Sequence, residues 1–399
     1  ETEGDIWLME KNIKDVDIVI LRRRRKRRRQ MAKFIAFILL ASIIFGLYVK
    51  RDVWFPKLEG IGSRFQSVKS SGGELSGENF PLNISGGIDY QVGNLNGYLA
   101  ILSDAYIYIY TEDGELYEER QHAYANAMLQ TSGKKALIYE SGGNKFRIDN
   151  KRKNLYTKKM EQNIIFARIS ENGNVAVITT SDTYICKLTV FDDSGEEIYS
   201  RNCVERVIDL TFNEDGTGCI LATSDAADGE IISKIISVSF DSKKDKWTSD
   251  ALNTMCLKTY YDRNGILVLG DTKCAYYSNK GELLTSYDYP SSLIDWDYRD
   301  GKIAMLFENE IKRQNYFTTI DSEKREPNQN EFSNSSANCI RISGGQVLIL
   351  SKEGIIKYDF NGGGEKNISS ESAYEKFILI DNYIFLLGYD RIDRIEYKG

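Results

Sequence analysis

Residues 164–200 read IIFARISENGNVAVITTSDTYICKLTVFDDSGEEIYS. Short runs rich in Ile, Val, Tyr and Thr alternate here with clusters of Asn, Asp, Ser and Gly, a pattern typical of strands joined by tight turns. The expected strands are 164–170, 174–180, 184–191 and 197–200. Because the turns are short, each strand pairs with the one before it. The stretch therefore predicts a four-stranded antiparallel meander.

The same unit recurs from residue 80 to the last residue. Its first hairpin turn appears eight times, at spacings of 36 to 49 residues that average about 41. Repeated four-stranded units of this length are typical of a β-propeller. The sequence therefore predicts an all-β, eight-bladed β-propeller. The turns are Asn96-Gly97, Ser132-Gly133, Asn172-Gly173, Asp215-Gly216, Asn264-Gly265, Asp300-Gly301, Gly344-Gly345 and Asp381-Asn382.

The two ends of the repeat region predict how the ring closes. The last unit contains three expected strands, the third at 391–397. An additional strand at 80–85 precedes the first complete unit and contains Pro81, which suits an outer edge. We expect this strand to complete the eighth blade, because closure removes the open edges of the ring.

A basic run and an apolar run precede the repeats. The uncharged run at 34–49 would form a helix of about 24 Å, and the stem of Lys33 can extend it toward the thickness of a bilayer. We expect one transmembrane helix. A cleavable signal peptide is the alternative, but small residues at cleavage spacing do not follow the run. The basic residues are Arg22, Arg23, Arg24, Arg25, Lys26, Arg27, Arg28 and Arg29.

Charge asymmetry orients this span, since basic flanks stay on the cytoplasmic side. The predicted order is a cytoplasmic tail at 1–21, a basic juxtamembrane segment at 22–33 in contact with anionic lipid headgroups, and the helix at 34–49. A Gly- and Ser-rich extracytoplasmic linker at 50–78 and the propeller at 79–399 follow. The predicted location is the cytoplasmic membrane, with the propeller outside.

Charge also argues against a nucleic acid partner. The chain carries −6 and residues 1–51 carry +7, so residues 52–399 carry −13. An acidic domain repels phosphate backbones.

Two segments, 122–128 and 132–148, resemble a known family. The chain looks like the single-span propeller proteins of Clostridia and related Firmicutes that are described only as a domain of unknown function. The resemblance covers nearly everything after the basic run, and it implies a bacterial, membrane-anchored, WD40-like or quinoprotein-like propeller. It brings no catalytic residues. Ala125 and Ala127 depart from the Ser and Pro expected there.

Few residues suggest chemistry. His122 is the only histidine, which excludes multi-histidine metal sites. We expect it to be a structural residue between the first two blades, or else a partner contact, together with Tyr124 and Arg147 of the resembling segments. No cofactor or metal is predicted.

The six cysteines form no Cys-x-x-Cys pair, so zinc and iron–sulfur sites are not expected. Folding the hairpin around Ser194 brings Cys186 and Cys203 roughly opposite each other. A disulfide between them is one possibility. Buried free thiols are the other, and the sequence favours them.

The favoured functional hypothesis is a non-enzymatic binding or scaffolding module for a protein or a cell-envelope polymer. The alternative is a glycan-acting lyase or hydrolase, or a quinoprotein-like enzyme. Convergent acids and tryptophans in the central channel would favour the enzyme. A sensor that signals to the short tail ranks third.

Overall fold

The computed structural model describes residues 79–84, 89–309, 314–331, 337–352, 354–368 and 374–397. The predicted tail, basic segment, transmembrane helix and linker lie outside these residues. Within the described part of the chain, no helix is long and apolar enough to span a bilayer.

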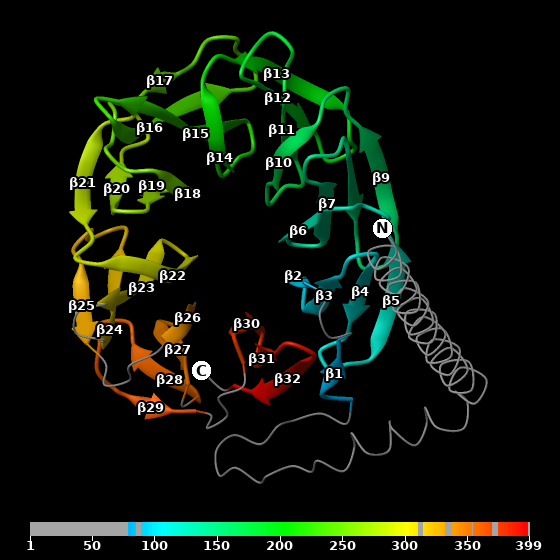
Figure 1. Cartoon of the computed structure of the whole chain (residues 1–399), viewed down its shortest axis with the longest axis vertical. Coiled ribbons are helices and arrows are strands. Elements are labelled where there is room, and N and C mark those ends of the chain that lie inside the picture. The colour runs from blue at the N-terminus through cyan, green and yellow to red at the C-terminus, as the bar shows by residue number, and fades with distance from the viewer. Residues whose placement is uncertain are drawn as a thin grey trace, which may run out of the picture. The chain divides into compact units, whose positions relative to one another are not determined.

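Eight four-stranded antiparallel sheets stand around a central opening (Figure 1), as the turn spacing predicted. Blade 1 contains β2 (Gln91–Leu95), β3 (Tyr98–Leu102), β4 (Tyr106–Tyr110) and β5 (Leu116–Gln121). Blade 2 contains β6 (Ala127–Ser132), β7 (Lys135–Glu140), β8 (Lys145–Asp149) and β9 (Asn154–Lys159). Blade 3 contains β10 (Ile164–Ile169), β11 (Val175–Thr179), β12 (Cys186–Phe191) and β13 (Glu197–Cys203). Blade 4 contains β14 (Arg206–Phe212), β15 (Gly218–Ala227), β16 (Glu230–Ser239) and β17 (Trp247–Thr248).

The second half of the ring follows the same order, with the first strand of each blade innermost (Figure 1). Blade 5 contains β18 (Cys256–Asp262), β19 (Gly265–Gly270), β20 (Lys273–Tyr277) and β21 (Leu283–Asp288). Blade 6 contains β22 (Ser292–Arg299), β23 (Lys302–Asn309), β24 (Gln314–Asp321) and β25 (Asn328–Glu331). Blade 7 contains β26 (Ala337–Ser343), β27 (Gln346–Ser351), β28 (Gly354–Asp359) and β29 (Lys366–Asn367). Blade 8 contains β30 (Lys376–Ile380), β31 (Tyr383–Leu387), β32 (Arg391–Glu396) and β1 (Leu82–Asn83).

The predicted closure is confirmed. β1 pairs with β32 in antiparallel register, with Leu82 opposite Ile392 and Asn83 opposite Arg391. Phe80 packs against Phe385, with 5.8 Å between ring centroids. The N-terminal strand therefore joins blade 8 by both backbone and side-chain contacts.

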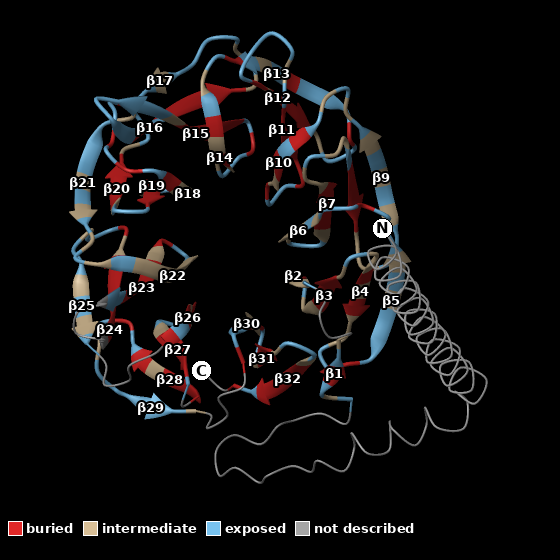
Figure 2. Cartoon of the chain, viewed as in Figure 1, coloured by how far each residue is buried: buried red, intermediate tan, exposed pale blue. Residues whose placement is uncertain are grey.

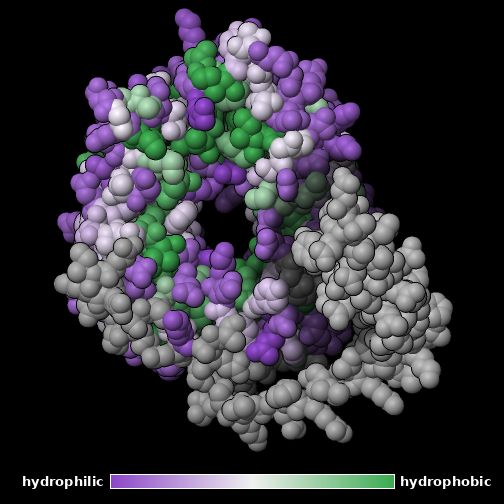
Figure 3. All heavy atoms as spheres, viewed as in Figure 1, coloured by the Kyte–Doolittle hydropathy of each residue, from purple (hydrophilic) through white to green (hydrophobic). Residues whose placement is uncertain are grey.

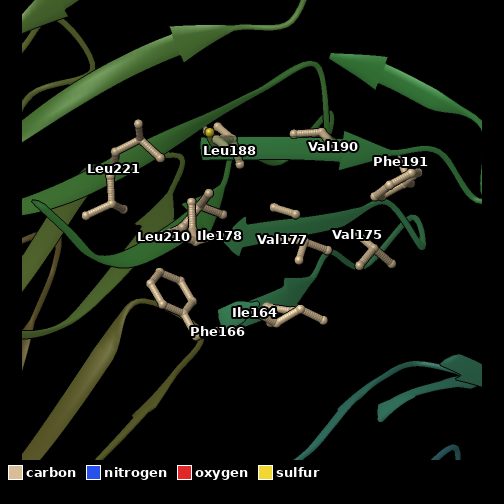
Figure 4. Close-up of a cluster of buried hydrophobic side chains, with 14 of the residues drawn as sticks. Ile164, Phe166, Val175, Val177, Ile178, Leu188, Val190, Phe191, Leu210 and Leu221 are labelled. Carbon is tan, nitrogen blue, oxygen red and sulfur yellow. The ribbon is translucent and has the colours of Figure 1, made fainter. Parts of the chain in front are cut away.

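The core lies between the blades. All five residues of β11 are buried because a middle strand has a neighbouring blade against each face, whereas β5 alternates between partly and fully exposed positions (Figure 2). In blade 3, apolar side chains of β10, β11 and β12 meet Leu210 and Leu221 of blade 4 (Figure 4). Packing between blades therefore makes the ring one continuous domain.

Blade 3 also corrects one predicted boundary. The expected strand 184–191 starts pairing only at Cys186, because its partner β13 ends at Cys203, directly opposite. Tyr184 and Ile185 therefore belong to the preceding connection, and their side chains are exposed.

Candidate binding surfaces of the ring

The alternating strand directions give the ring two different faces. We call one the turn face; it carries the hairpin turns after the first and third strands of each blade, such as 170–174 and 192–196. We call the other the loop face; it carries the connections after the second strands and between blades, such as 180–185 and 204–205.

A buried carboxylate near the channel joins three blades. Asp209 lies on β14 immediately after a β-bulge and is fully buried. Its Oδ1 accepts hydrogen bonds from Nε and Nη2 of Arg168, at 3.0 and 2.6 Å, and from Nζ of Lys258 at 3.2 Å. Its Oδ2 accepts from the backbone N–H and the hydroxyl of Thr259, at 2.8 and 3.0 Å. The carboxylate therefore holds blades 3, 4 and 5 together.

A second group of this kind joins blades 6 and 7. Oδ2 of Asp295 accepts hydrogen bonds from the backbone N–H of Ile340 at 2.9 Å and from Nη1 of Arg341 at 2.7 Å. Oδ2 of Asp297 accepts a hydrogen bond from the N–H of Ile342 at 2.8 Å. Burial raises the pKa of Asp297. These acids have cation or backbone partners, so their geometry fits a structural role.

The channel widens at the turn face into a cavity of about 1050 Å³. Polar and charged side chains of blades 2 to 6 line it, including Arg168, Asn172, Asn213, Asn264 and Glu323. Below them, the rings of Tyr260 and Tyr298 stack at 4.2 Å, and Trp296 Nε1–H donates to the Tyr260 hydroxyl at 2.8 Å. The mouth is thus polar and the aromatic side chains are engaged with one another.

The loop face carries a group of exposed apolar side chains that we call the apolar patch. Val204 is 65% exposed, Ile185 53% and Ile231 50%. On the face seen in Figure 3, apolar side chains occur at several places around the ring, with a large group over blades 3 and 4. The apolar patch consists of Tyr184, Ile185, Val204, Ile231 and Met255.

Backbone and side-chain hydrogen bonds link the segments that carry the apolar patch. The N–H of Ile185 donates to the carbonyl of Cys203 at 3.1 Å, which places Ile185 beside Val204. Ser224 then pairs with Arg206 on one side and with Ser233 on the other, and this links the connection at 204–205 to the start of β16. The Ser233 hydroxyl donates to the carbonyl of Thr254 at 2.8 Å, which brings Met255 close to Ile231.

Acidic side chains surround the apolar patch, and we call them the acidic rim. Segments 181–185, 204–206, 225–231 and 250–255 contain six carboxylates and one cation, Arg206. Arg201, outside these segments, lies 3.5 Å from Glu205 and offsets one of the charges. The acidic rim consists of Asp182, Glu205, Asp225, Asp228, Glu230 and Asp250.

The hairpin of β15 and β16 projects beside the apolar patch. Both strands contain ten residues, and their pairing continues through Ala226 opposite Ile231 and Ala227 opposite Glu230. The neighbouring β14 stops at Arg206, opposite Ser224. The hairpin tip therefore extends beyond blade 4 and carries part of both the apolar patch and the acidic rim.

His122 lies in the connection between blades 1 and 2, where the sequence placed it, and is buried. Its Nε2 is 3.0 Å from the carbonyl oxygen of Ser103, and its Nδ1 accepts the N–H of Tyr124 at 3.1 Å. Since a carbonyl can only accept, the ring proton is on Nε2 and the neutral imidazole is satisfied. Burial also lowers the pKa of His122.

The other two predicted residues of this region are buried as well. Arg147 donates two hydrogen bonds to the carboxylate of Asp149, at 2.7 and 2.6 Å, and one to the carbonyl of Gln121 at 2.9 Å. Tyr124 packs near His122, with 5.7 Å between ring centroids. These contacts favour the structural interpretation of His122, Tyr124 and Arg147 over partner contact.

Cys186 and Cys203 are direct cross-strand partners on β12 and β13. Both are buried, and both are free thiols. A hydrogen bond from Cys203 lowers the pKa of Cys186, and the same hydrogen bond, together with burial, raises the pKa of Cys203. The predicted pairing in space is present, and the disulfide itself stays a prediction.

Two other expectations concern charge and metals. The basic residues 22–29 lie outside the described residues, so their lipid contact stays a prediction. Across the described ranges, no group of three or more His, Cys, Asp or Glu side chains is placed to hold a metal ion.

Sequence reasoning did not find the apolar patch. Its five residues come from three connections and the start of β16, spread over residues 184–255, and only the fold brings them together. The available signal was the 49-residue spacing around Asp215 and Asn264, which indicated an enlarged fourth unit.

Comparisons with known proteins agree with this fold. Residues 82–396 match a family described as "Family of unknown function (DUF5711)". Among solved structures, the chain is similar to Sqt1 from Saccharomyces cerevisiae, with a TM-score of 0.60 and 10% identity over 80% of this chain and 100% of that one. It is also similar to BamB from Moraxella catarrhalis, with a TM-score of 0.53 and 13% identity over 80% of this chain and 98% of that one. A comparison with curated protein sequences finds no match. At such low identity, these likenesses show the propeller fold alone.

Proposed function

We propose that this chain, which belongs to the family of unknown function DUF5711, is a membrane-anchored, extracytoplasmic propeller that binds a partner protein on its loop face. The observation that carries the proposal is the apolar patch. Five apolar side chains on neighbouring segments of the loop face remain exposed to water. Contiguous exposed apolar surface with a polar border is typical of protein interaction sites.

The partners of Asp209 and Asp295 favour a structural role for these two acids over acid–base catalysis. A glycan-acting enzyme requires two carboxyl groups that face the substrate, one of them able to donate a proton. Asp209 and Asp295 are instead bound by Arg168, Lys258, Arg341 and backbone N–H groups. Trp296 uses its N–H on Tyr260. These groups fit a rigid support.

The anchoring part of the proposal rests on the sequence. The eight cations at 22–29 before the apolar run at 34–49 favour a single span of a Gram-positive cytoplasmic membrane, with the propeller outside. Ser194 is exposed on the turn face, and the native cysteines are buried. We expect Ser194→Cys to react with a membrane-impermeant maleimide on intact cells. Labelling only after lysis would place the propeller inside.

The binding part is tested by photo-crosslinking in the native cell. A photoreactive amino acid replaces Val204 in the full chain, and a matched variant carries it at Leu283, which is 54% exposed on the outer strand β21. We expect discrete protein adducts from position 204 and none from position 283. Equal adducts at the two positions, or none at 204, would overturn the proposal.

A further inference from the structure

We infer that the partner segment that occupies the apolar patch combines apolar side chains with Lys and Arg. The inference rests on the proposed function and adds the chemistry of the partner. It depends on the acidic rim, a feature separate from the apolar patch itself. The rim limits which of three possible occupants, a protein segment, a second copy of this chain or a membrane surface, can approach.

The positions of the acids make the charge argument. Asp225, Asp228 and Glu230 lie at the exposed tip of the β15–β16 hairpin, next to Ile231 of the apolar patch. Asp182 lies two residues before Tyr184, and Asp250 precedes the segment that carries Met255. An incoming apolar segment therefore meets negative charge on several sides, and cationic flanks would be attracted on approach.

The same charges disfavour the other occupants. A second copy would bring its own acidic rim, and residues 52–399 carry a net −13, so self-association through this face places like charges together. An anionic lipid surface is repelled for the same reason. A cationic, apolar protein segment satisfies both the patch and the rim.

The approach to the patch is also open to an extended or helical segment. The β15–β16 pairing continues past the end of β14, so Ile231 lies on the part of the hairpin that projects beyond its neighbouring strand. Val204 and Ile185 form the other side of this approach. The partner segment would lie between these two borders.

The test uses the full chain in nanodiscs of zwitterionic lipid and measures fluorescence anisotropy. The probe is a labelled sixteen-residue peptide of alternating Leu and Lys, and the comparison peptide alternates Leu and Glu. We expect saturable binding of the Leu–Lys peptide alone. Val204→Ser combined with Ile231→Ser should weaken it about tenfold, because buried apolar side chains contribute to affinity in proportion to the area covered. The matched control combines Leu116→Ser with Leu283→Ser, which changes two side chains of similar exposure, 50% and 54%, on outer strands and should leave the affinity within about twofold.

A second variant tests the acidic rim. Asp225→Asn, Asp228→Asn and Glu230→Gln together should weaken Leu–Lys binding several-fold at low salt, and the difference from the unmodified chain should shrink at about 0.3 M salt through screening. Equal binding of both peptides, or no effect of the rim variant, would overturn the inference. So would equal effects of the patch and control variants. All substituted side chains are exposed, and melting curves check that each variant folds.

Further arms separate the occupants and the two proposals. If sedimentation shows that the unmodified chain forms an oligomer and that the patch variant is monomeric, a second copy is the occupant and the inference is overturned. Tighter binding of the detergent-purified chain to anionic than to zwitterionic vesicles, lost in the patch variant, would identify lipid and overturn it as well. Crosslinks at Val204 without discrimination between the peptides would retain the proposed function and reject its cationic partner.

Discussion

Replacement of Asp209 by Asn tests how much the interblade carboxylate stabilises the ring. The substitution keeps the size of the side chain but removes its charge, and it turns an N–H₂ group toward donors that previously met oxygen. The amide keeps one oxygen, so it can accept from Arg168 and Lys258 or from Thr259, but not from both sides as the carboxylate does. Removing one partner of a buried ion pair costs about 3 to 5 kcal/mol of the free energy of unfolding, because the remaining charge stays without compensation.

We expect the lower end of that range, about 3 kcal/mol, since Arg168 and Lys258 are partly exposed and channel water can solvate them. A domain of this length unfolds with an entropy of about 0.7 kcal/mol/K, so the Tm should fall by about 4 °C. Thermal and urea unfolding of the full chain measure both quantities. Adding Lys258→Met to the variant should recover part of the loss, because it removes one of the uncompensated cations.

The matched control is Asp245→Asn. Asp245 pairs with Arg201 at 3.0 Å, but its side chain is 32% exposed and Arg201 also contacts Glu205, so its loss should cost at most about 1 kcal/mol. The reasoning is refuted if Asp209→Asn and Asp245→Asn destabilise equally, or if Lys258→Met lowers the stability of the Asp209 variant further.

Three other predictions concern closure, the thiols and pH. Leu82→Asp should lower the free energy of unfolding by about 3 kcal/mol, because it buries a charge in the closing blade. Asn83→Asp, at the exposed neighbouring position, should change it by less than about 0.5 kcal/mol, and urea unfolding of both variants measures the difference. Diamide should oxidise Cys186 and Cys203 to a disulfide, so the thiols counted in denaturant fall from six to four. The free energy of unfolding should then rise by about 3 kcal/mol. A disulfide mapped by peptide analysis to another pair would contradict this. Burial lowers the pKa of His122 below 6.5, so the unfolded chain takes up this proton first as the pH falls and stability should decrease below about pH 6.5. The Tm difference between the unmodified chain and His122→Gln should therefore shrink between about pH 7.5 and 5.5. A constant difference would argue against a buried neutral imidazole.

The fold was predictable because each unit repeats the same local pattern of strands and turn residues. Turns such as Asn172-Gly173 end strands on their own, and the fourth strand of blade 8 could be inferred from the spare strand around Pro81. Boundaries were less predictable. Tyr184 and Ile185 have high strand propensity, but the ladder with β13 begins only at Cys186, and Ile185 adds just its N–H to the carbonyl of Cys203.

The site was less accessible to sequence reasoning for a physical reason. Hydrophobic alternation shows which residues suit a pleated strand, but it does not show which lie at a strand's end and face water. The Asp209 network was similarly hidden, since Arg168 and Lys258 are 41 and 49 residues away from it. A lone acid within the apolar strand Val207 to Phe212 was the only signal.

The pairing of β1 with β32 has a consequence for biosynthesis. β1 leaves the ribosome before any complete blade, yet its partner is made only after the other seven blades. Until then, the growing polypeptide holds an unmatched edge at each end of a nearly finished ring, where edge strands are prone to wrong pairing. Correct assembly of this propeller thus waits on its last few dozen residues, and a chain that stalls before residue 391 would leave both edges uncovered.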